Sequence, residues 1–161
     1  MKLLETILVA TDFSPSADDA ARVATGVAKA FGSRVVLLYV MPDMPEAGVA
    51  RQMLQEKSTE RLEEIAGRMR AAGVGTVEVA VAAGAPCEQI LGHAGTQEAN
   101  LIFIGSGQKP DDDRFPLGII ASRLCRLATK PVWVVKPGAP DAVARILCAV
   151  DFSDTSRRAL T

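Results

Sequence analysis

The chain has 161 residues, of which 48% are hydrophobic and 23% charged, a balance that suits one folded core and excludes disorder for most of its length. Its net charge is −1, with acidic and basic residues mixed along the chain, so we expect no basic surface for nucleic acid or an anionic membrane. No apolar run approaches the ~18 residues of a membrane span, and the N-terminal residues lack a secretory apolar stretch. Cys87, Cys125 and Cys148 lack metal-site spacing. We therefore predict a cytoplasmic protein without a bound metal.

Short stretches rich in Val, Ile and Leu predict five β-strands. Four of them are apolar at nearly every position, which is typical of parallel strands covered by helices on both faces. The third is interrupted by Glu78 and is expected nearer an edge of the sheet. The predicted strands cover residues 6–10, 35–40, 77–81, 101–104 and 132–135.

Helical patterns fill the intervals between the strands. The first helix is expected to begin after Ser14, an N-cap residue followed by Pro15, and to end at Gly32. Ala20, Ala24, Val27 and Phe31 form its expected buried stripe. The other helices are predicted over residues 54–69, 87–98 and 117–128. Because strands and helices alternate, the sequence predicts an α/β fold, a doubly wound parallel sheet of five strands with helices on both faces.

A ligand site is expected where the winding of such a sheet reverses, beyond the carboxyl ends of its strands. With the strand order 3-2-1-4-5, this point lies between the first and fourth strands. Asp12 follows the first strand, and Gly105-Ser106-Gly107 follow the fourth. Glycines let a backbone approach a ligand and present N–H groups to an anion, and Gly118 opens a helix whose N-terminus favours phosphate.

Each of these residues also has a purely structural explanation. Asp12 is equally suited to cap the following helix, and Gly105 and Gly107 are equally suited to a tight turn. The run Asp111–Asp113 is typical of a solvated loop, with a metal site as the alternative. His93 is the only histidine, so no second one completes a Ser–His or Cys–His pair, and we predict no catalytic residue.

The end of the chain repeats its beginning. ILVATDFSPSADDAA starts at Ile7 and ILCAVDFSDTSRRAL starts at Ile146, a constant offset of 139 residues with seven identities in fifteen positions. This period is the size of a whole domain. We therefore predict one domain over residues 1–138, a linker over 139–144, and the start of a second, incomplete domain over 145–161. Its strand is expected either to fray or to add to an exposed sheet edge of a neighbouring chain.

Several of these segments together resemble the universal stress protein family. They are ILVATDFSPSADDA, RVVLLYV, GAPCEQILGHAGTQEANLIFIGS and LATKPVWVVKPG, and the resemblance spans residues 3–138. It implies the strand order 3-2-1-4-5 in a Rossmann-like sheet of the kind found in adenine nucleotide alpha hydrolases. The repeat resembles tandem members of the family, in which two domains form an internal pseudo-dimer.

The resemblance also implies nucleotide contacts. Ala10 and Asp12 would lie on the adenosine side and Val40 would line the adenine pocket, while a glycine pattern would hold the phosphates. The positions that match or neighbour this pattern are Gly105, Ser106, Gly107 and Gly118. Two positions depart from it, because Gln108 replaces a glycine and Ile119 replaces a hydroxyl residue. ATP or AMP is therefore a possible ligand, with the adenosine half of the site retained and the phosphate half altered.

We predict a stress-response binding and signalling domain that is not an enzyme, acts through dimerisation, and has weak or lost adenine-nucleotide binding. The alternative is a functional ATP-binding domain with low ATPase or phosphotransfer activity, although the chain lacks a P-loop and its Lys. A flavin-binding electron carrier is compatible with the fold alone.

In the family the fifth strand pairs with a partner domain. The resemblance therefore makes Val132, Trp133, Val134 and Val135 a candidate dimer interface, with core packing as the alternative. The partner would be a second copy of the chain or a second domain of the full-length protein.

Overall fold

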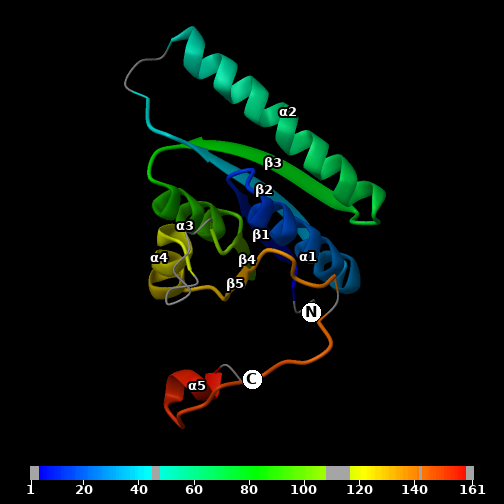
Figure 1. Cartoon of the computed structure of the whole chain (residues 1–161), viewed down its shortest axis with the longest axis vertical. Helices are drawn as coiled ribbons and strands as arrows, with labels where there is room; N and C mark the ends of the chain where they lie inside the picture. Colours follow the sequence, from blue (N-terminus) through cyan, green and yellow to red (C-terminus); the bar gives the residue numbers. More distant parts are fainter. Residues whose placement is uncertain (1–3, 45–47, 108–116, 142, 159–161) are drawn as a thin grey trace.

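The computed structural model describes residues 4–44, 48–107, 117–141 and 143–158 of the chain. Strands and helices alternate within these residues, and five parallel strands form one sheet in the order β3-β2-β1-β4-β5 (Figure 1). The strands are β1 (Thr6–Thr11), β2 (Arg34–Met41), β3 (Thr76–Ala83), β4 (Leu101–Gly105) and β5 (Val132–Val135). The helices are α1 (Pro15–Phe31), α2 (Val49–Ala71), α3 (Pro86–Thr96), α4 (Ile119–Leu127) and α5 (Asp154–Arg158). The predicted fold class and strand order are confirmed.

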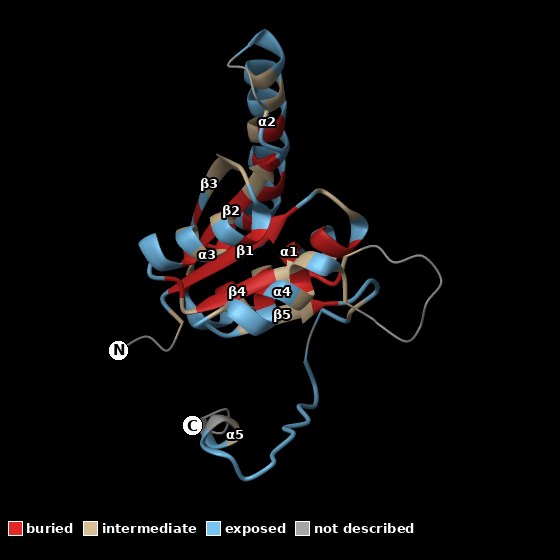
Figure 2. Cartoon of the chain, turned by 90° about the vertical axis from the view of Figure 1, so that its left-hand side faces the viewer, coloured by how far each residue is buried: buried red, intermediate tan, exposed pale blue. Residues whose placement is uncertain are grey.

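The central strand β1 is buried at all six positions, because helices cover both faces of the sheet (Figure 2). Alternate residues point to opposite faces. Ile7 and Val9 pack with residues of α1 and α2, whereas Leu8 and Ala10 pack with residues of α3 and α4. These two clusters form the core. The edge position expected for the strand that contains Glu78 is also confirmed, since β3 ends the sheet.

Helix α1 begins and ends where its capping residues predict. Ser14 is the N-cap, its side chain accepts a hydrogen bond from the Ala17 N–H at 3.3 Å, and Gly32 takes a left-handed conformation at the C-cap. The prediction that Phe31 is buried is wrong, because its side chain is 46% exposed. A 17-residue helix is about 25 Å long and outruns the roughly 20 Å of the six-residue strand beneath it.

The other helices differ from the prediction mainly at their ends. Helix α4 begins at Ile119 with Gly118 as its N-cap, two residues later than predicted. Helix α2 begins at Val49, and its first buried residue is Ser58, so its N-terminal turns project beyond the sheet (Figure 2). The apolar pattern predicted residues 54–69 of α2, which include the part that packs on the sheet, and missed the exposed first turn that begins at Val49.

The chain that leaves β5 is held against α1. The Gly138 N–H donates to Asp19 Oδ2 at 2.8 Å, and Arg22 bonds Asp19 Oδ1 at 2.8 Å as well as Asp141 Oδ1 and the Ala139 carbonyl. We call these residues the α1 clamp. The hydrogen bond from Arg22, aided by that from Gly138, lowers the pKa of Asp19.

Beyond the α1 clamp the chain departs from the sheet (Figure 1). The segment predicted to start a second domain forms no strand over residues 143–150, and Ile146 and Leu147 are 85% and 95% exposed. A short helix, α5, follows. The domain boundaries drawn from the repeat stay a prediction.

Candidate functional site

The turn between β1 and α1 is built by side chains that accept backbone hydrogen bonds. Thr11 Oγ1 accepts the Phe13 N–H at 3.0 Å, and Asp12 Oδ1 accepts the Ser14 N–H at 2.9 Å. Asp12 therefore has the structural role that its position offers, an Asx turn. None of the described residues hydrogen-bonds its second oxygen, Oδ2, and the side chain is exposed. As far as the described residues go, one carboxylate oxygen is therefore left for a ligand.

Phe13 has a left-handed backbone, with φ at 62°, which is unusual for a residue other than glycine. Its ring lies 4.7 Å from that of Tyr39, and the Arg61 guanidinium carbon lies 4.1 Å from the ring centre. An aromatic contact and a cation–π contact thus hold this side chain on both the β2 and α2 sides. The turn that carries Asp12 is fixed from outside the site.

The glycines expected at a phosphate site are also required by the packing of the chain. A Cβ atom at Gly105 would come within 2.6 Å of the Ser16 carbonyl carbon and 2.7 Å of the Ala17 nitrogen. Gly107 has a φ of 83°, and a Cβ on it would lie 3.2 Å from the Gly118 Cα. The structural explanation of these glycines therefore holds whether or not a ligand binds.

Two backbone N–H groups of this region bond the protein itself. The Gly118 N–H donates to the Ser106 carbonyl at 2.6 Å, and the Ser106 N–H donates to the Val135 carbonyl at 2.8 Å. Gly118 caps α4 without a side-chain hydrogen bond, so the first-turn N–H groups of that helix are the donors left for a ligand. The backbone around Gly105, Gly107 and Gly118 therefore offers fewer free N–H groups to a phosphate than the glycines alone indicate.

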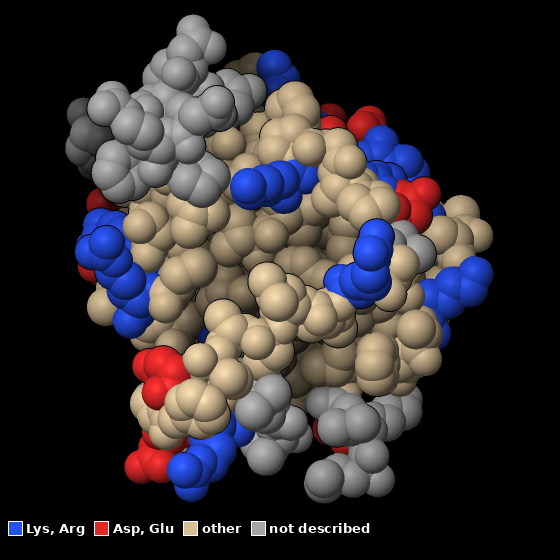
Figure 3. All heavy atoms as spheres, turned by 60° about the horizontal axis from the view of Figure 1, so that its bottom comes forward, with Lys and Arg blue, Asp and Glu red and all other residues tan. Residues whose placement is uncertain are grey.

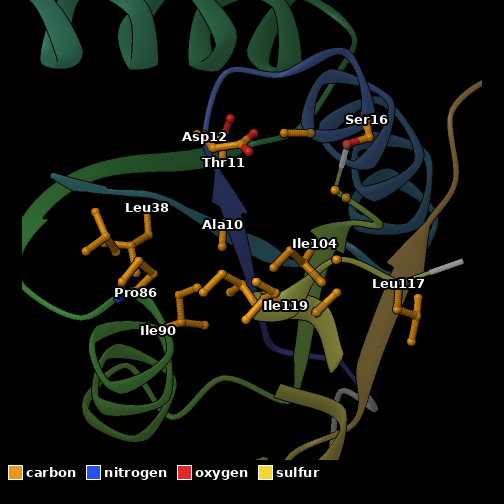
Figure 4. A pocket seen from close by; sticks show the side chains of 17 residues that line it. Ala10, Thr11, Asp12, Ser16, Leu38, Pro86, Ile90, Ile104, Leu117 and Ile119 are labelled. Carbon is orange, nitrogen blue, oxygen red and sulfur yellow. The ribbon is translucent and has the colours of Figure 1, made fainter. Parts of the chain in front are cut away.

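A cavity of about 470 Å³ opens at the carboxyl ends of β1 and β4, where the winding of the sheet reverses (Figure 4). This volume lies in the range of about 300–1,000 Å³ that is usual for small-molecule sites. Of the residues predicted from the sequence, all but the buried Ser106 line it: Ala10, Asp12, Val40, Gly105, Gly107 and Gly118.

Most of the apolar lining was missed by the sequence analysis. The larger side chains that it overlooked are Leu38, Pro86, Ile90, Ile104, Leu117, Ile119 and Ile120. A signal for some of them was present. Leu38 lies two residues before Val40 and so shares its face of β2, and Pro86 begins the helix that follows β3 at the same edge of the sheet. Ile119 was noted only as a departure from a phosphate motif, not as a lining residue.

Asp12 is the only ionisable side chain in the described lining of the cavity. The positions Gln108 and Asp111–Asp113 lie outside the described residues. Within the residues that are described, no group of three or more His, Cys, Asp or Glu side chains could hold a metal ion. No helix of the described chain is long and apolar enough to cross a membrane.

A doubly wound parallel sheet with an amphipathic cavity at its reversal point is typical of small α/β domains that bind small molecules. The model of the universal stress protein family matches residues 4–136. The universal stress protein MJ0531 of Methanocaldococcus jannaschii is 30% identical over an alignment of 142 positions, which covers 83% of this chain and 83% of the relative. The chain belongs to the universal stress protein family.

Solved structures with the same architecture include the following two. The hypothetical protein MJ0577 superposes with a TM-score of 0.74 at 25% identity, over 86% of this chain and 99% of that one. A universal stress protein in complex with cAMP superposes with a TM-score of 0.72 at 23% identity, over 84% of this chain and 99% of that one. At this identity the second likeness shows the fold alone.

Proposed function

We propose that this chain is a cytoplasmic, non-enzymatic stress-response domain that binds the adenosine part of an adenine nucleotide between β1 and β4. The observation that carries the proposal is a cavity of about 470 Å³ with Asp12 at its polar rim and aliphatic side chains along its walls. A carboxylate oxygen suits the hydroxyl groups of a ribose, and an apolar wall suits a flat base. That a related fold has been solved with cAMP is consistent with this ligand class.

A polyphosphate fits this cavity less well than adenosine does. The described lining holds a negative charge and no Lys, Arg or His, so added phosphate charge meets repulsion without a cationic partner. Ile119 offers no hydroxyl, and the Gly118 N–H is bonded to Ser106. The same lack of cationic groups favours binding over phosphoryl transfer, the alternative activity.

Calorimetry of the full chain with AMP and ATP, with and without Mg²⁺, tests the proposal. We expect AMP to bind, ATP to bind at least about tenfold more weakly, and Asp12→Ala to weaken AMP binding about tenfold. Asp43→Ala is the matched control, because Asp43 is exposed and lies outside the cavity. Absence of binding by every adenine compound would refute the proposal, and phosphate release from ATP above background would support the enzymatic alternative.

We also propose that the domain assembles through β5, either as a homodimer or with a second domain. Among the described strands β5 has one neighbour, β4, so its outer edge is open. Val132, Trp133 and Val134 are half-buried, and Trp133 stacks on Phe103 with ring centres 4.9 Å apart, so core packing accounts for only part of their surface. The lower side of the molecule, where α5 and the segment before it also lie, has a mostly uncharged centre with Lys and Arg side chains around it and Asp and Glu side chains at its margin (Figure 3).

The two copies of the repeat share local structure as well as sequence, which supports a second domain. Asp151 Oδ1 accepts the Ser153 N–H at 2.9 Å and Phe152 has a φ of 64°, which reproduces the turn at Asp12 and Phe13. Ser153 Oγ accepts the Ser156 N–H at 3.1 Å, as Ser14 does for Ala17. We therefore keep residues 145–161 as the proposed start of a second domain of the same type.

A further inference from the structure

We infer, on the basis of the proposed function, that the cavity selects an uncharged adenosine-type nucleoside that carries a short apolar group on its 5′ carbon. The observation behind this inference is the layout of the lining. A polar rim formed by Asp12 and Thr11 lies above aliphatic side chains that extend to both sides of Ala10, and the described residues present no positive charge to a phosphate.

The two apolar groups lie on either side of Ala10 (Figure 4). Leu38, Pro86 and Ile90 form one wall, which we call the α3 wall; Ile104, Leu117 and Ile119 line the part nearer α4, which we call the α4 wall. Asp12 and Thr11 lie above Ala10, at the end of β1. A ligand bonded to Asp12 therefore has an apolar surface on each side of its polar group.

A nucleoside has the same three-part arrangement. Its ribose carries two neighbouring hydroxyl groups, flanked on one side by the base and on the other by the 5′ carbon. If the hydroxyl groups donate to Asp12 Oδ2, the base and the 5′ substituent extend toward different walls. The α3 wall places Leu38 of β2 beside Pro86 and Ile90, which gives the flat base an apolar surface.

The α4 wall then receives the 5′ substituent, and its chemistry selects an apolar one. The Ile119 side chain is 79% exposed although it lines the cavity, so a ligand there would cover aliphatic surface that water now contacts. Of the backbone donors near it, the Gly118 and Ser106 N–H groups already have carbonyl partners. The first-turn N–H groups of α4 are left to donate to an acceptor on the 5′ substituent, such as a thioether or hydroxyl.

The test compares four probes with the full chain by isothermal titration calorimetry: adenosine, 5′-deoxy-5′-methylthioadenosine, AMP and ATP. We expect the methylthio compound to bind about tenfold more tightly than adenosine, because it buries a group the size of about two methylenes. AMP and ATP should bind more weakly than adenosine. If AMP or ATP binds more tightly than the methylthio compound, the inferred ligand class is wrong and the proposed function still stands. If no probe binds, both fail.

Two variants locate the effect within the cavity. Ile119→Ser should reduce the preference for the methylthio compound to about threefold or less, since the aliphatic surface that it covers is lost. Leu127→Ser is the matched control on the same helix, because Leu127 is also exposed, at 56%, and does not line the cavity. Asp12→Asn retains an oxygen for the Ser14 N–H but removes the negative charge that repels phosphates. In this variant the preference for adenosine over ATP should therefore be smaller than in wild type. An unchanged preference in Ile119→Ser would overturn the inference.

Discussion

Gly105 is the residue on which the geometry of the reversal point depends most directly. A Cβ atom there would come within 2.6 Å of the backbone of Ser16. Neither helix α1 nor the buried strand β4 can shift easily to remove this clash. We expect Gly105→Ala to lower the free energy of unfolding by about 2–3 kcal/mol. Gly67→Ala is the control, because a Cβ at this position in α2 meets nothing within 4 Å and should stabilise by about 0.5–1 kcal/mol. Urea denaturation of both variants distinguishes these signs.

The left-handed backbone of Phe13 gives a second prediction at this scale. Once the ring is removed, glycine should be the more stable replacement, because alanine at a positive φ is strained by about 1–2 kcal/mol. We therefore expect Phe13→Gly to unfold at a higher urea concentration than Phe13→Ala. The same pair at Phe31, which is helical, should show the reverse order. Equal midpoints for the two Phe13 variants would contradict the role of strain.

Residue roles that depend on local sequence were accessible without a structure. Ser14 was correctly assigned as a cap because its hydrogen bond spans three residues, whereas Asp12, for which a capping role was the alternative, instead forms an Asx turn to the Ser14 N–H. The contact between Gly105 and Ser16 could not be anticipated, since it joins residues far apart in the chain through the position of α1 over β4. Ile119 could likewise be recognised as a lining residue only in the structure, where it lies with other aliphatic residues around the cavity.

At the scale of elements, the α1 clamp ties the end of β5 to α1 through charged groups. Arg22 and the Gly138 N–H stabilise the ionised form of Asp19, so its pKa lies below the ordinary value of 3.8. The resulting stability is fully present above that value and is lost as the pH falls below it through the folded-state pKa. We expect the melting temperatures of wild type and Asp19→Asn to differ at neutral pH and to converge in acid. Arg22→Gln should likewise weaken the fall in melting temperature at acidic pH. If the melting temperatures of wild type and the variants change with pH in parallel, the role assigned to Asp19 is wrong.

The existence and order of the elements followed from the sequence, whereas their ends did not. Buried strands are apolar on both faces, so runs such as residues 35–40 were recognisable without a partner strand. Helix ends depend on what lies beneath them. Phe31 is exposed because α1 extends beyond the end of the sheet. Val49 belongs to α2 although no residue of that turn is buried.

For the molecule as a whole, assembly through β5 makes a specific prediction about its backbone. The carbonyls of Pro131 and Val135 accept hydrogen bonds from Ile102 of β4 and from Ser106 just after it, so by alternation the main-chain groups of Val134 point to the open edge. Val134→Pro removes an edge donor without removing a bond to β4. We expect light scattering to show a dimer for wild type and for Val134→Thr, and a monomer for Val134→Pro with an unchanged circular dichroism spectrum. A monomeric wild type would refute assembly through this edge.

The site illustrates how far a sequence defines a whole molecule. With the strand order that the family resemblance implies, topology rules placed the candidate site at the reversal between β1 and β4 and pointed to Asp12, because the carboxyl ends of parallel strands meet at one edge. The chemistry of the cavity depends equally on α3 and α4, whose side chains reach it only after the chain has wound around the sheet. Its aliphatic walls were therefore found in the structure and not in the motif.

The turn that forms both at Asp12 and at Asp151 bears on how the chain folds. At Asp151 it forms with no sheet beside it, and hydrogen bonds from Ser153 lower the pKa of that carboxyl to about 2. By contrast, the pairing of Thr6 with Asn100 joins residues 94 positions apart and must await the loop closures between them. A corner that forms from its own few residues within about microseconds is available long before those strands meet. The angle between β1 and α1 would then guide the collapse of the sheet, and Asp12 would be in place before the cavity around it exists.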